Sequence, residues 1–304
     1  MYFLKRLVLL IPLLLVISFL AFGLMHAAPG GPFDKERAPA SPEIERNLKA
    51  KYHLDEPWLR QYLRYLGGLL HGDFGPSLKY RNHTVTDVIA QALPVSVSLG
   101  ALAFCFAVGL GIPWGVLLAV RRGQWADYLW GLVALLMVCI PALVLGPLLV
   151  LAFAVHWQLF PVALWKSARH AVLPMLTLGL FFAGRIARLM RESMTTTLQA
   201  EFITAARAKG LSENAILLKH ALRLAVLPIV SYAGPMLADL LTGSFIVESI
   251  FQIPGLGGFF VNSSFNADYP MLMGLVLLYA VLLVVLNLVV DLLYLLLDRR
   301  VKYE

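Results

Sequence analysis

Long apolar runs alternate along the chain with short polar segments, and six such runs can be distinguished. They are Leu7–Ala28, Leu93–Val120, Tyr128–Trp157, His170–Gly184, Leu224–Val247 and Tyr269–Val290. A helix needs roughly 20 apolar residues to cross the hydrocarbon of a bilayer. The fourth run is too short alone, so we expect it to continue through Arg185, Arg188 and Arg191, whose long side chains can reach the water. The pattern predicts an all-α, polytopic membrane protein with six transmembrane helices.

The composition agrees with this pattern. The chain is 60% hydrophobic and 14% charged, with a mean hydropathy of +0.77, whereas soluble domains have about a quarter of their residues charged. The net charge of +7 would suggest nucleic acid as a partner of a soluble protein. In a membrane protein it indicates basic cytoplasmic loops instead, so no nucleic-acid partner is expected. The first run, in residues 1–28, is too long for a signal peptide and is predicted to be a retained transmembrane helix.

The basic residues of the short loops give the orientation, because Lys and Arg collect on the cytoplasmic side. One side of the membrane would hold Lys5, Arg6, Arg121, Arg122, Arg185, Arg188, Arg191, Arg207, Lys209, Lys219, Arg223, Arg299, Arg300 and Lys302. The short loops of the other side would hold only Lys166 and Arg169. Both termini and the loop at residues 195–223 are therefore predicted to be cytoplasmic.

The segment of residues 29–92 would then be a small helical extracytoplasmic insertion between the first two helices. Ser41-Pro42-Glu43 is typical of a helix start. Trp58, Tyr62, Tyr65, Leu66 and Leu69 share one face of a helix. A short helix is expected to begin at Thr84 before the second span. Residues 93–304 would form the remaining five-helix core.

No catalytic chemistry is visible in the sequence. It contains no phosphate-binding loop, no G-x-S-x-G and no H-E-x-x-H pattern. The histidines have no metal-ligand spacing, and Cys105 and Cys139 are expected to pack among apolar neighbours. We predict no catalytic, cofactor or metal site, and hence a protein that is not an enzyme by itself.

Few polar residues interrupt the apolar runs. Asp239 lies within the fifth run, Asn287 within the sixth, and Asp291 follows near the cytoplasmic end. An acid in a membrane span is costly and suggests function. Asp239 is therefore a candidate residue of a translocation pathway, the alternative being that it bonds to a neighbouring helix.

The segment Phe202–Leu222, "FITAARAKGLSENAILLKHAL", is a cationic island between two apolar runs. Strong helix formers end at Gly210, and Ser212 can cap a second helix. A DNA-binding helix–turn–helix has a similar pattern, but the adjoining spans would hold it against the bilayer. Two interpretations are left, a loop attracted to anionic lipid and a docking element for a soluble partner.

"TAARAKG" followed by "HAL" resembles the cytoplasmic coupling loop of ABC importer permeases, whose pattern is E-A-A-x-x-x-G-x9-I-x-L-P. Ala205, Ala206, Gly210 and Leu222 match, whereas Thr204, His220 and Arg223 replace the acid, the Ile and the Pro. The stretches "KYHLDEPWLRQYLRYLGGLLHGDFGPS", "RIARLMRESM" and "ESIFQIPGLGGFFVNSSFNADYP" resemble the B-type subunit of the peptide/nickel permeases, and of these the oligopeptide permeases most closely. This resemblance covers nearly the whole chain.

The resemblance implies a permease subunit of the bacterial inner membrane that forms a peptide pathway with a C-type permease. Two cytoplasmic ABC ATPases would hold ATP and Mg, and an extracytoplasmic binding protein would deliver peptide. It places ATPase coupling at a set of loop residues, namely Ala205, Ala206, Arg207, Lys209, Gly210, Leu211, Glu213 and His220. It places an outer gate or permease interface at Pro254, Gly255, Leu256 and Gly257. For that second segment the alternative is an interfacial loop anchored by Phe251, Phe259 and Phe260. For the whole chain the alternative is a self-sufficient secondary transporter or channel.

Overall fold

The computed structural model describes residues 2–27, 56–77, 79–80, 83–242, 244–266 and 268–297, and the side chains of these residues except 2–10, 25–27 and 293–297. In this part of the chain every regular element is a helix, and the one β contact is an isolated bridge between Pro76 and Thr84. The predicted all-α class is confirmed. The proposed helix start at Ser41-Pro42-Glu43 lies outside the described residues.

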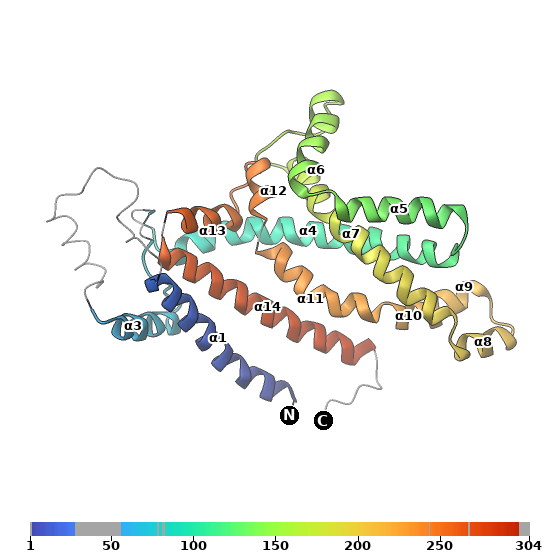
Figure 1. The fold of residues 1–304 in the computed structure, drawn as a ribbon, viewed down its shortest axis with the longest axis horizontal. Coiled ribbons are helices and arrows are strands. Elements are labelled where there is room, and N and C mark those ends of the chain that lie inside the picture. The colour runs from blue at the N-terminus through green and yellow to red at the C-terminus, as the bar shows by residue number, and fades with distance from the viewer. Residues whose placement is uncertain are drawn as a thin grey trace. The chain divides into compact units, whose positions relative to one another are not determined.

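The chain forms two compact units. The first comprises residues 1–94 and 255–282, and the second comprises residues 95–254 and 283–304. Two helices, α4 (Val85–Val120) and α14 (Tyr269–Leu297), contribute residues to both units (Figure 1).

In the first unit, α3 (Trp58–Leu70) packs against α1 (Tyr2–Ala27). Tyr62 is buried, and its hydroxyl lies 2.8 Å from Ser18 Oγ while its ring contacts Phe22 at a centroid distance of 5.4 Å. This confirms the helix predicted from the spacing of Trp58 to Leu69. The described apolar stretch of α1, Ile11–Leu24, is shorter than the other candidate spans.

A buried carboxylate joins the segment that follows α3 to the start of α14, also within the first unit. Asp268 is fully buried, and its Oδ2 accepts hydrogen bonds from Ser77 Oγ at 2.5 Å and from the Lys79 amide at 3.3 Å. Its other oxygen accepts from the Met271 amide at 3.4 Å, in the first turn of α14. The chain between α3 and α4 is therefore fixed onto α13 (Leu256–Phe265) and α14, where Tyr80 also contacts Phe259.

The helix expected at Thr84 is not a separate one. Thr84 and Asp87 form a capping box, in which Asp87 Oδ2 accepts from the Thr84 amide at 3.0 Å and Thr84 Oγ1 accepts from the Asp87 amide at 3.1 Å. The helix then continues without a break to Val120 as α4. The prediction of a separate short helix was wrong because Pro94 is accommodated inside α4, which needs no break at that point.

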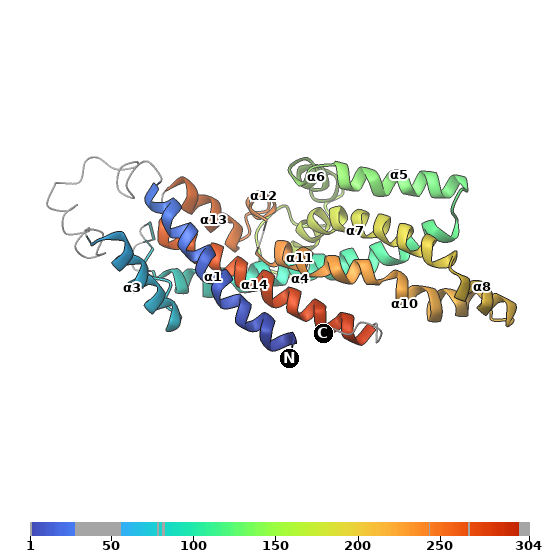
Figure 2. The ribbon, with the colours of Figure 1, turned by 60° about the horizontal axis from the view of Figure 1, so that its bottom comes forward.

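The second unit is built around α7 (Ala168–Leu198), which lies between α5 (Trp125–Cys139) and α11 (Leu227–Leu241) (Figure 2). The fourth apolar run does continue through its three arginines, as predicted. Close packing uses glycines: a Cβ built on Gly184 would lie 2.6 Å from the backbone oxygen of Ala134 on α5. Small residues let membrane helices approach in this way.

The third run, predicted as a single span, is broken. After α5 the chain turns by 106° into α6 (Ala142–Leu149) and the π-helix η1 (Val150–His156). The break falls at Ile140, whose backbone is extended, as expected for a residue before a proline. Pro141 also has no amide hydrogen with which to continue α5. The two cysteines, Cys105 of α4 and Cys139 of α5, are both exposed on this chain.

After α7 the second unit contains α8 (Glu201–Ala208), α9 (Glu213–Ala215), the π-helix η2 (Ile216–Ala221), α10 (Leu222–Ala225), α11 and α12 (Phe245–Ile250). Among the described residues, four helices are long and apolar enough to cross a membrane, or five if the bent pair at Pro141 is one span. The count of six and the side on which the termini lie remain predictions.

Candidate functional site

The loop at residues 195–223 folds as the sequence predicts. Helix α8 ends at Ala208, and Gly210 follows with φ of +80°, a left-handed conformation that a Cβ would strain. The Leu211 amide bonds back to the Ala206 oxygen at 3.3 Å and the Gly210 amide to the Arg207 oxygen at 2.9 Å, which satisfies the last carbonyls of α8. Ser212 Oγ then accepts from the Ala215 amide at 3.4 Å as the cap of α9. Two short helices joined by a fixed turn result.

An ion pair crosses this turn. Arg207 donates from Nε to Glu213 Oε1 at 2.8 Å and from Nη2 to Oε2 at 3.1 Å. These hydrogen bonds lower the pKa of the Glu213 carboxyl and raise the pKa of Arg207, so the pair stays charged at neutral pH. Both side chains are exposed, and such pairs add little stability. Arg207, which the resemblance assigns to ATPase coupling, pairs here with Glu213 within the loop.

The two faces of the loop differ. Ile203, Ala206, Ile216 and Ala221 are buried in the core of the second unit. Ala206, one of the candidate coupling residues, therefore faces inward. Ala205, Lys209, Gly210, Leu211 and His220 are exposed on the outer face.

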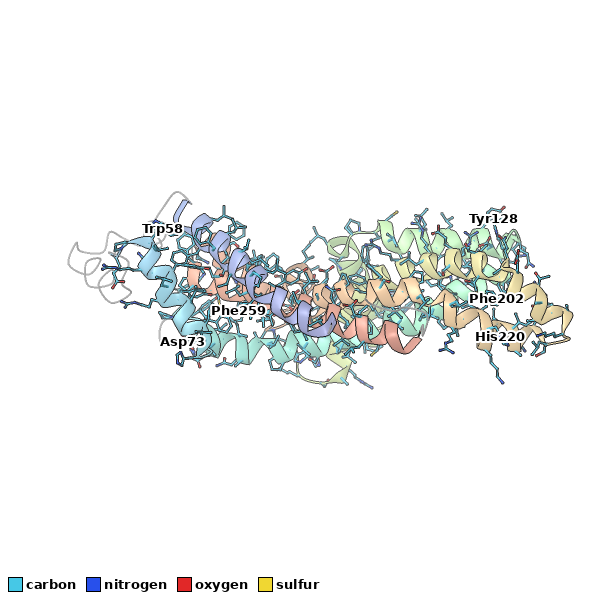
Figure 3. All side chains as sticks on the ribbon, turned by 90° about the horizontal axis from the view of Figure 1, so that it is seen from below. Trp58, Asp73, Tyr128, Phe202, His220 and Phe259 are labelled. Carbon is cyan, nitrogen blue, oxygen red and sulfur yellow. The ribbon has the colours of Figure 1, made fainter. Side chains whose placement is uncertain are left out.

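The outer face also carries large apolar side chains that sequence reasoning missed. Phe202 is 42% exposed, Leu211 39% and Leu218 63%. Figure 3 places Phe202 and His220 at the end of the second unit where Tyr128 also lies. The sequence could have indicated this exposure, because Phe202 and Leu218 do not follow the helical spacing of the buried positions in their helices.

A buried ion pair holds the helix that leads into the loop. Asp127, in the first turn of α5, is 3% exposed. Its two oxygens accept from Arg191 Nε and Nη2, each at 2.7 Å, and Oδ2 also accepts from the Gly123 amide at 3.1 Å. The end of α7 is thus fastened to α5. An acid at the start of an apolar helix, with an arginine in a neighbouring span, was the signal that could have indicated this pair.

The candidate pathway residue Asp239 is exposed on α11. Ser231 and Pro235 are exposed at the same helical spacing, so these residues share one face. The face that packs inward contains Gly234, where a Cβ would lie 2.7 Å from the amide oxygen of Asn287 on α14. Asp291, one turn further along α14, is half-buried. Asn287 and Asp291 of α14 are thus half-buried between packed helices, whereas Asp239 lies on the exposed surface of α11.

The four outer-gate candidates are divided between the units. Pro254 is exposed at the end of the second, and Gly255, Leu256 and Gly257 are buried in the first. Phe251 is 1% exposed within the second unit, and its oxygen accepts from the Leu164 amide at 2.8 Å. As a result, Phe251 does not serve as the lipid anchor considered above, whereas Phe260 is 44% exposed.

A second buried acid, Glu248 of α12, was not singled out from the sequence. It is 1% exposed and accepts from Ser96 Oγ of α4 at 2.8 Å. Its position in an acid-poor segment between the fifth and sixth apolar runs was the available signal. No group of His, Cys, Asp or Glu that could hold a metal ion occurs among the residues that the structure describes.

Comparisons with known proteins show the family to which this chain belongs. Residues 111–303 match the family model described as "Binding-protein-dependent transport system inner membrane component". The chain belongs to this family. It is 44% identical over 301 residues to an oligopeptide transport system permease protein of Haemophilus influenzae, covering 98% of each chain. It is 43% identical to a dipeptide transport system permease protein of Bacillus subtilis, covering 99% of this chain and 97% of the relative.

Solved structures of ABC transporters share the fold of the family member described here. A chain of the MetNI methionine ABC transporter in an inward-facing conformation aligns with a TM-score of 0.56 at 22% identity, over 70% of this chain and 97% of that one. A chain of an amino acid ABC transporter aligns with a TM-score of 0.52 at 16% identity, over 71% and 95%. This is a multi-pass membrane protein with the helical fold of ABC importer permeases.

Proposed function

We propose that this chain is the B-type permease subunit of an ATP-driven ABC importer that takes up peptides. The observation that carries the proposal is full-length identity above 40% to permeases named for oligopeptide and dipeptide transport. A permease subunit of this family works with a second permease, ATPases and a substrate-binding protein. Here the second permease would be a C-type subunit, and two cytoplasmic ATPases would hold the ATP and Mg, with no cofactor on this chain.

The topology that fits this role has six spans, with both termini on the cytoplasmic side of a bacterial inner membrane. The distribution of Lys and Arg between the short loops supports it. The same orientation puts the loop at residues 195–223 on the cytoplasmic side, within reach of an ATPase, and residues 29–92 outside.

The loop would act as a coupling element seated on an ATPase. Its outer face combines exposed Phe202, Leu211 and Leu218 with Lys209 and His220, and an exposed apolar patch rimmed by polar groups is typical of protein interfaces. Gly210 and the Arg207–Glu213 pair hold the turn, so a push on α8 moves the loop as one body. The Asp127–Arg191 pair would pass the movement to α5 and α7. Rigid-body movement of this kind opens the pathway to alternate sides.

In the same scheme Asp239 lines the peptide pathway, because an ionisable residue in a span faces a cavity or a partner. Pro254, Gly255, Leu256 and Gly257 form an outer gate or the contact with the second permease. The gate role follows from the family resemblance, and the exposure of Asp239 on α11 supports the pathway role.

Reconstitution tests the function. The chain is placed in liposomes with the C-type permease, the two ATPases and the binding protein, and uptake of a labelled peptide is measured with and without ATP. We expect uptake to require ATP and all partners. If the chain alone moved peptide down a proton or ion gradient, it would be a self-sufficient secondary transporter and the proposal would be wrong.

Cross-linking tests the docking role. In a background with Cys105 and Cys139 replaced by alanine, the exposed positions Ala205 and Leu211 are changed to cysteine one at a time. We expect both to cross-link to an ATPase subunit in the assembled complex. Gln124→Cys, at an exposed position outside the loop, is the matched control and should give no product. Equal cross-linking from all three positions would refute the docking site.

A further inference from the structure

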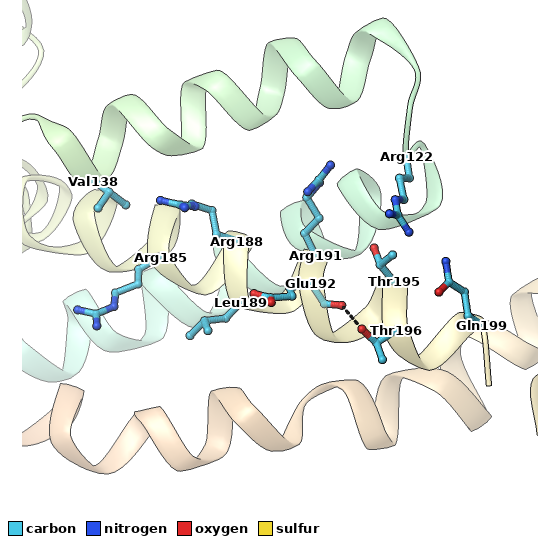
Figure 4. A pocket seen from close by; sticks show the side chains of 10 residues that line it. All are labelled: Arg122, Val138, Arg185, Arg188, Leu189, Arg191, Glu192, Thr195, Thr196 and Gln199. Carbon is cyan, nitrogen blue, oxygen red and sulfur yellow. Dashed lines mark hydrogen bonds between the residues drawn. The ribbon is translucent and has the colours of Figure 1, made fainter.

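A polar cavity of about 720 Å³ opens beside the second half of α7, between the end of α5 and the loop that joins α4 to α5. Figure 4 shows that most of its side chains come from α7. Its volume is within the usual range for sites that bind small molecules. The lining residues are Arg122, Val138, Arg185, Arg188, Leu189, Arg191, Glu192, Thr195, Thr196 and Gln199.

In the second half of α7 the exposed residues form a single stripe that lines this cavity. Arg185, Arg188, Glu192, Thr196 and Gln199 are exposed at intervals of three or four residues, so they share one helical face. From Ala171 to Gly184 every residue of α7 is buried or half-buried. The stripe thus brings charged groups together on one side of α7 just before the loop at residues 195–223.

The charges of the cavity are strongly unequal. Four guanidinium groups line it, and Arg191 is neutralised by its bidentate pair with Asp127. Within the described part of the chain neither Arg122 nor Arg188 forms an ion pair. Glu192 is the acid of the lining. A cavity of this kind attracts a carboxylate or phosphate group, for which arginine supplies paired donors.

The uncharged groups and the single acid narrow the choice of ligand. Thr195 Oγ1 is buried and has no hydrogen-bond partner among the described residues. Gln199 adds an exposed amide at the end of the cavity. A lipid phosphate would need only the cations. A short peptide has a carboxylate, an ammonium group and backbone amides, and would use the arginines, Glu192 and the neutral groups together.

Arg185 links this cavity to α11, the helix that carries Asp239. The Arg185 guanidinium lies 4.7 Å from the ring centroid of Tyr232 on α11, a cation–π contact. Tyr232 and Asp239 are seven residues apart and share one side of α11, about 10 Å from each other along the axis. The cavity therefore adjoins the helix face on which the candidate pathway residue lies.

The geometry points to a release-side peptide subsite in this chain: the cavity holds the C-terminal carboxylate of a short zwitterionic peptide on Arg122, which lies beside Thr195 and Gln199 (Figure 4), with Glu192 facing the ammonium group. This inference rests on the proposed function, since it names where the transported peptide is held on the cytoplasmic side. Its consequence is that peptide binds to the inward-open transporter without the binding protein, and that it must leave before the next cycle.

The test measures equilibrium binding of radiolabelled Ala-Ala-Ala to the assembled complex of two permeases and two ATPases in nanodiscs, without nucleotide and without the binding protein. The wild-type complex is also offered the same peptide with an amidated C-terminus. We expect the amide to bind at least about fivefold more weakly, because it lacks the charged acceptor that a guanidinium group pairs with, while solvent reduces the size of the loss. This comparison needs no variant.

Variants then assign the site. R122Q/R188Q should weaken binding of Ala-Ala-Ala about tenfold, and R122Q alone about threefold, because R122Q removes the charge-assisted partner of the carboxylate and R188Q lowers the positive charge of the cavity. R169Q, at an exposed arginine near the other end of α7, should bind like the wild type. If the double variant does not assemble, the single variant and the amide comparison decide.

Three results would overturn the inference: equal binding of peptide and amide, wild-type binding by R122Q/R188Q, or displacement of the peptide by an equal concentration of inorganic phosphate. The last would indicate a general anion site. Binding that appears only in nanodiscs with anionic lipid would indicate a headgroup site and would also overturn it. ATP-dependent uptake, measured on the same complex with the binding protein, separates the two proposals, because normal uptake with any of these results leaves the proposed function intact.

Discussion

The ion pair between α5 and α7 gives the sharpest prediction for the packing of the second unit. The substitution Asp127→Asn keeps the shape of the side chain but removes its charge. Arg191 then faces a neutral amide, of which only one atom accepts, so one of the two 2.7 Å hydrogen bonds is lost. The Gly123 amide also loses a charged acceptor.

The magnitude follows from the burial of the two partners. Breaking a fully buried pair costs about 3–5 kcal/mol, because a charge is left without compensation. Here the side chain of Asp127 is 2% exposed but that of Arg191 is 40% exposed, so water can solvate the guanidinium in part. We therefore expect a loss of about 1.5–3 kcal/mol, which lowers the melting temperature by roughly 5 °C for a chain of this size.

The assay is thermal unfolding of the detergent-solubilised complex, followed by the monodisperse fraction at one heating rate because unfolding is expected to be irreversible. Arg207→Gln is the matched control, since it breaks a bidentate pair of the same type in which both partners are exposed, and we expect no measurable shift. The double variant Asp127→Asn/Arg191→Gln should melt above the single variant, because both charges are then gone. A wild-type melting temperature for Asp127→Asn, or an equal loss in the control, would refute the argument.

Three further substitutions test the packing of helices and loop. Gly100→Ala would place a Cβ 2.4 Å from a backbone oxygen of α11, so it should destabilise the complex by about 1–3 kcal/mol in the thermal unfolding assay. Gly109→Ala, in the same helix, is the control, because its Cβ would meet nothing within 4 Å. It should be neutral or stabilising in the same assay. At Gly210 a Cβ would meet open space, but the φ of +80° disfavours any residue with a Cβ, so we expect Gly210→Ala to introduce about 1 kcal/mol of local strain. The ratio of peptide imported to ATP hydrolysed should fall. An unchanged ratio would show that this turn is not needed for coupling. Ala206→Leu should reduce the amount of folded permease because Ala206 is 8% exposed. Ala205→Leu should leave the amount of folded permease unchanged while weakening ATPase binding, and the reverse order would contradict the assignment of faces.

Much of the fold follows from local pattern, and the loop shows why. Gly210 after a run of helix formers and Ser212 before Glu213 are signals that act within a few residues, so the turn and the cap were predictable. The extension of the fourth span through its arginines was also predictable, because long basic side chains reach water from a helix end. Hydrophobicity alone, however, did not reveal the 106° break at Pro141, because both sides of the break are equally apolar.

Most contacts that fix the candidate site join residues that are far apart in the sequence. Arg207 meets Glu213 across six positions, but Asp127 and Arg191 are 64 residues apart and Ser96 and Glu248 are 152 apart. Pairing at such distances depends on which helices become neighbours, and a single sequence does not report this. The same holds for Ala206, whose inward direction is set by the packing of α8 on η2.

These features together make α7 the element through which the proposed coupling and the proposed release would communicate. Arg191 is fastened to Asp127 on α5, while its neighbours on the exposed stripe, Arg188 and Glu192, line the cavity. The helix ends at Leu198, and α8 of the docking loop starts three residues later. A displacement of the loop by an ATPase would therefore shift the cavity and its polar stripe with it, since a helix without an internal break moves as one body. On this argument, closure of the ATPases and loss of the release-side subsite are a single event, and Asp127→Asn should weaken the coupling between them as well as the stability of the unit.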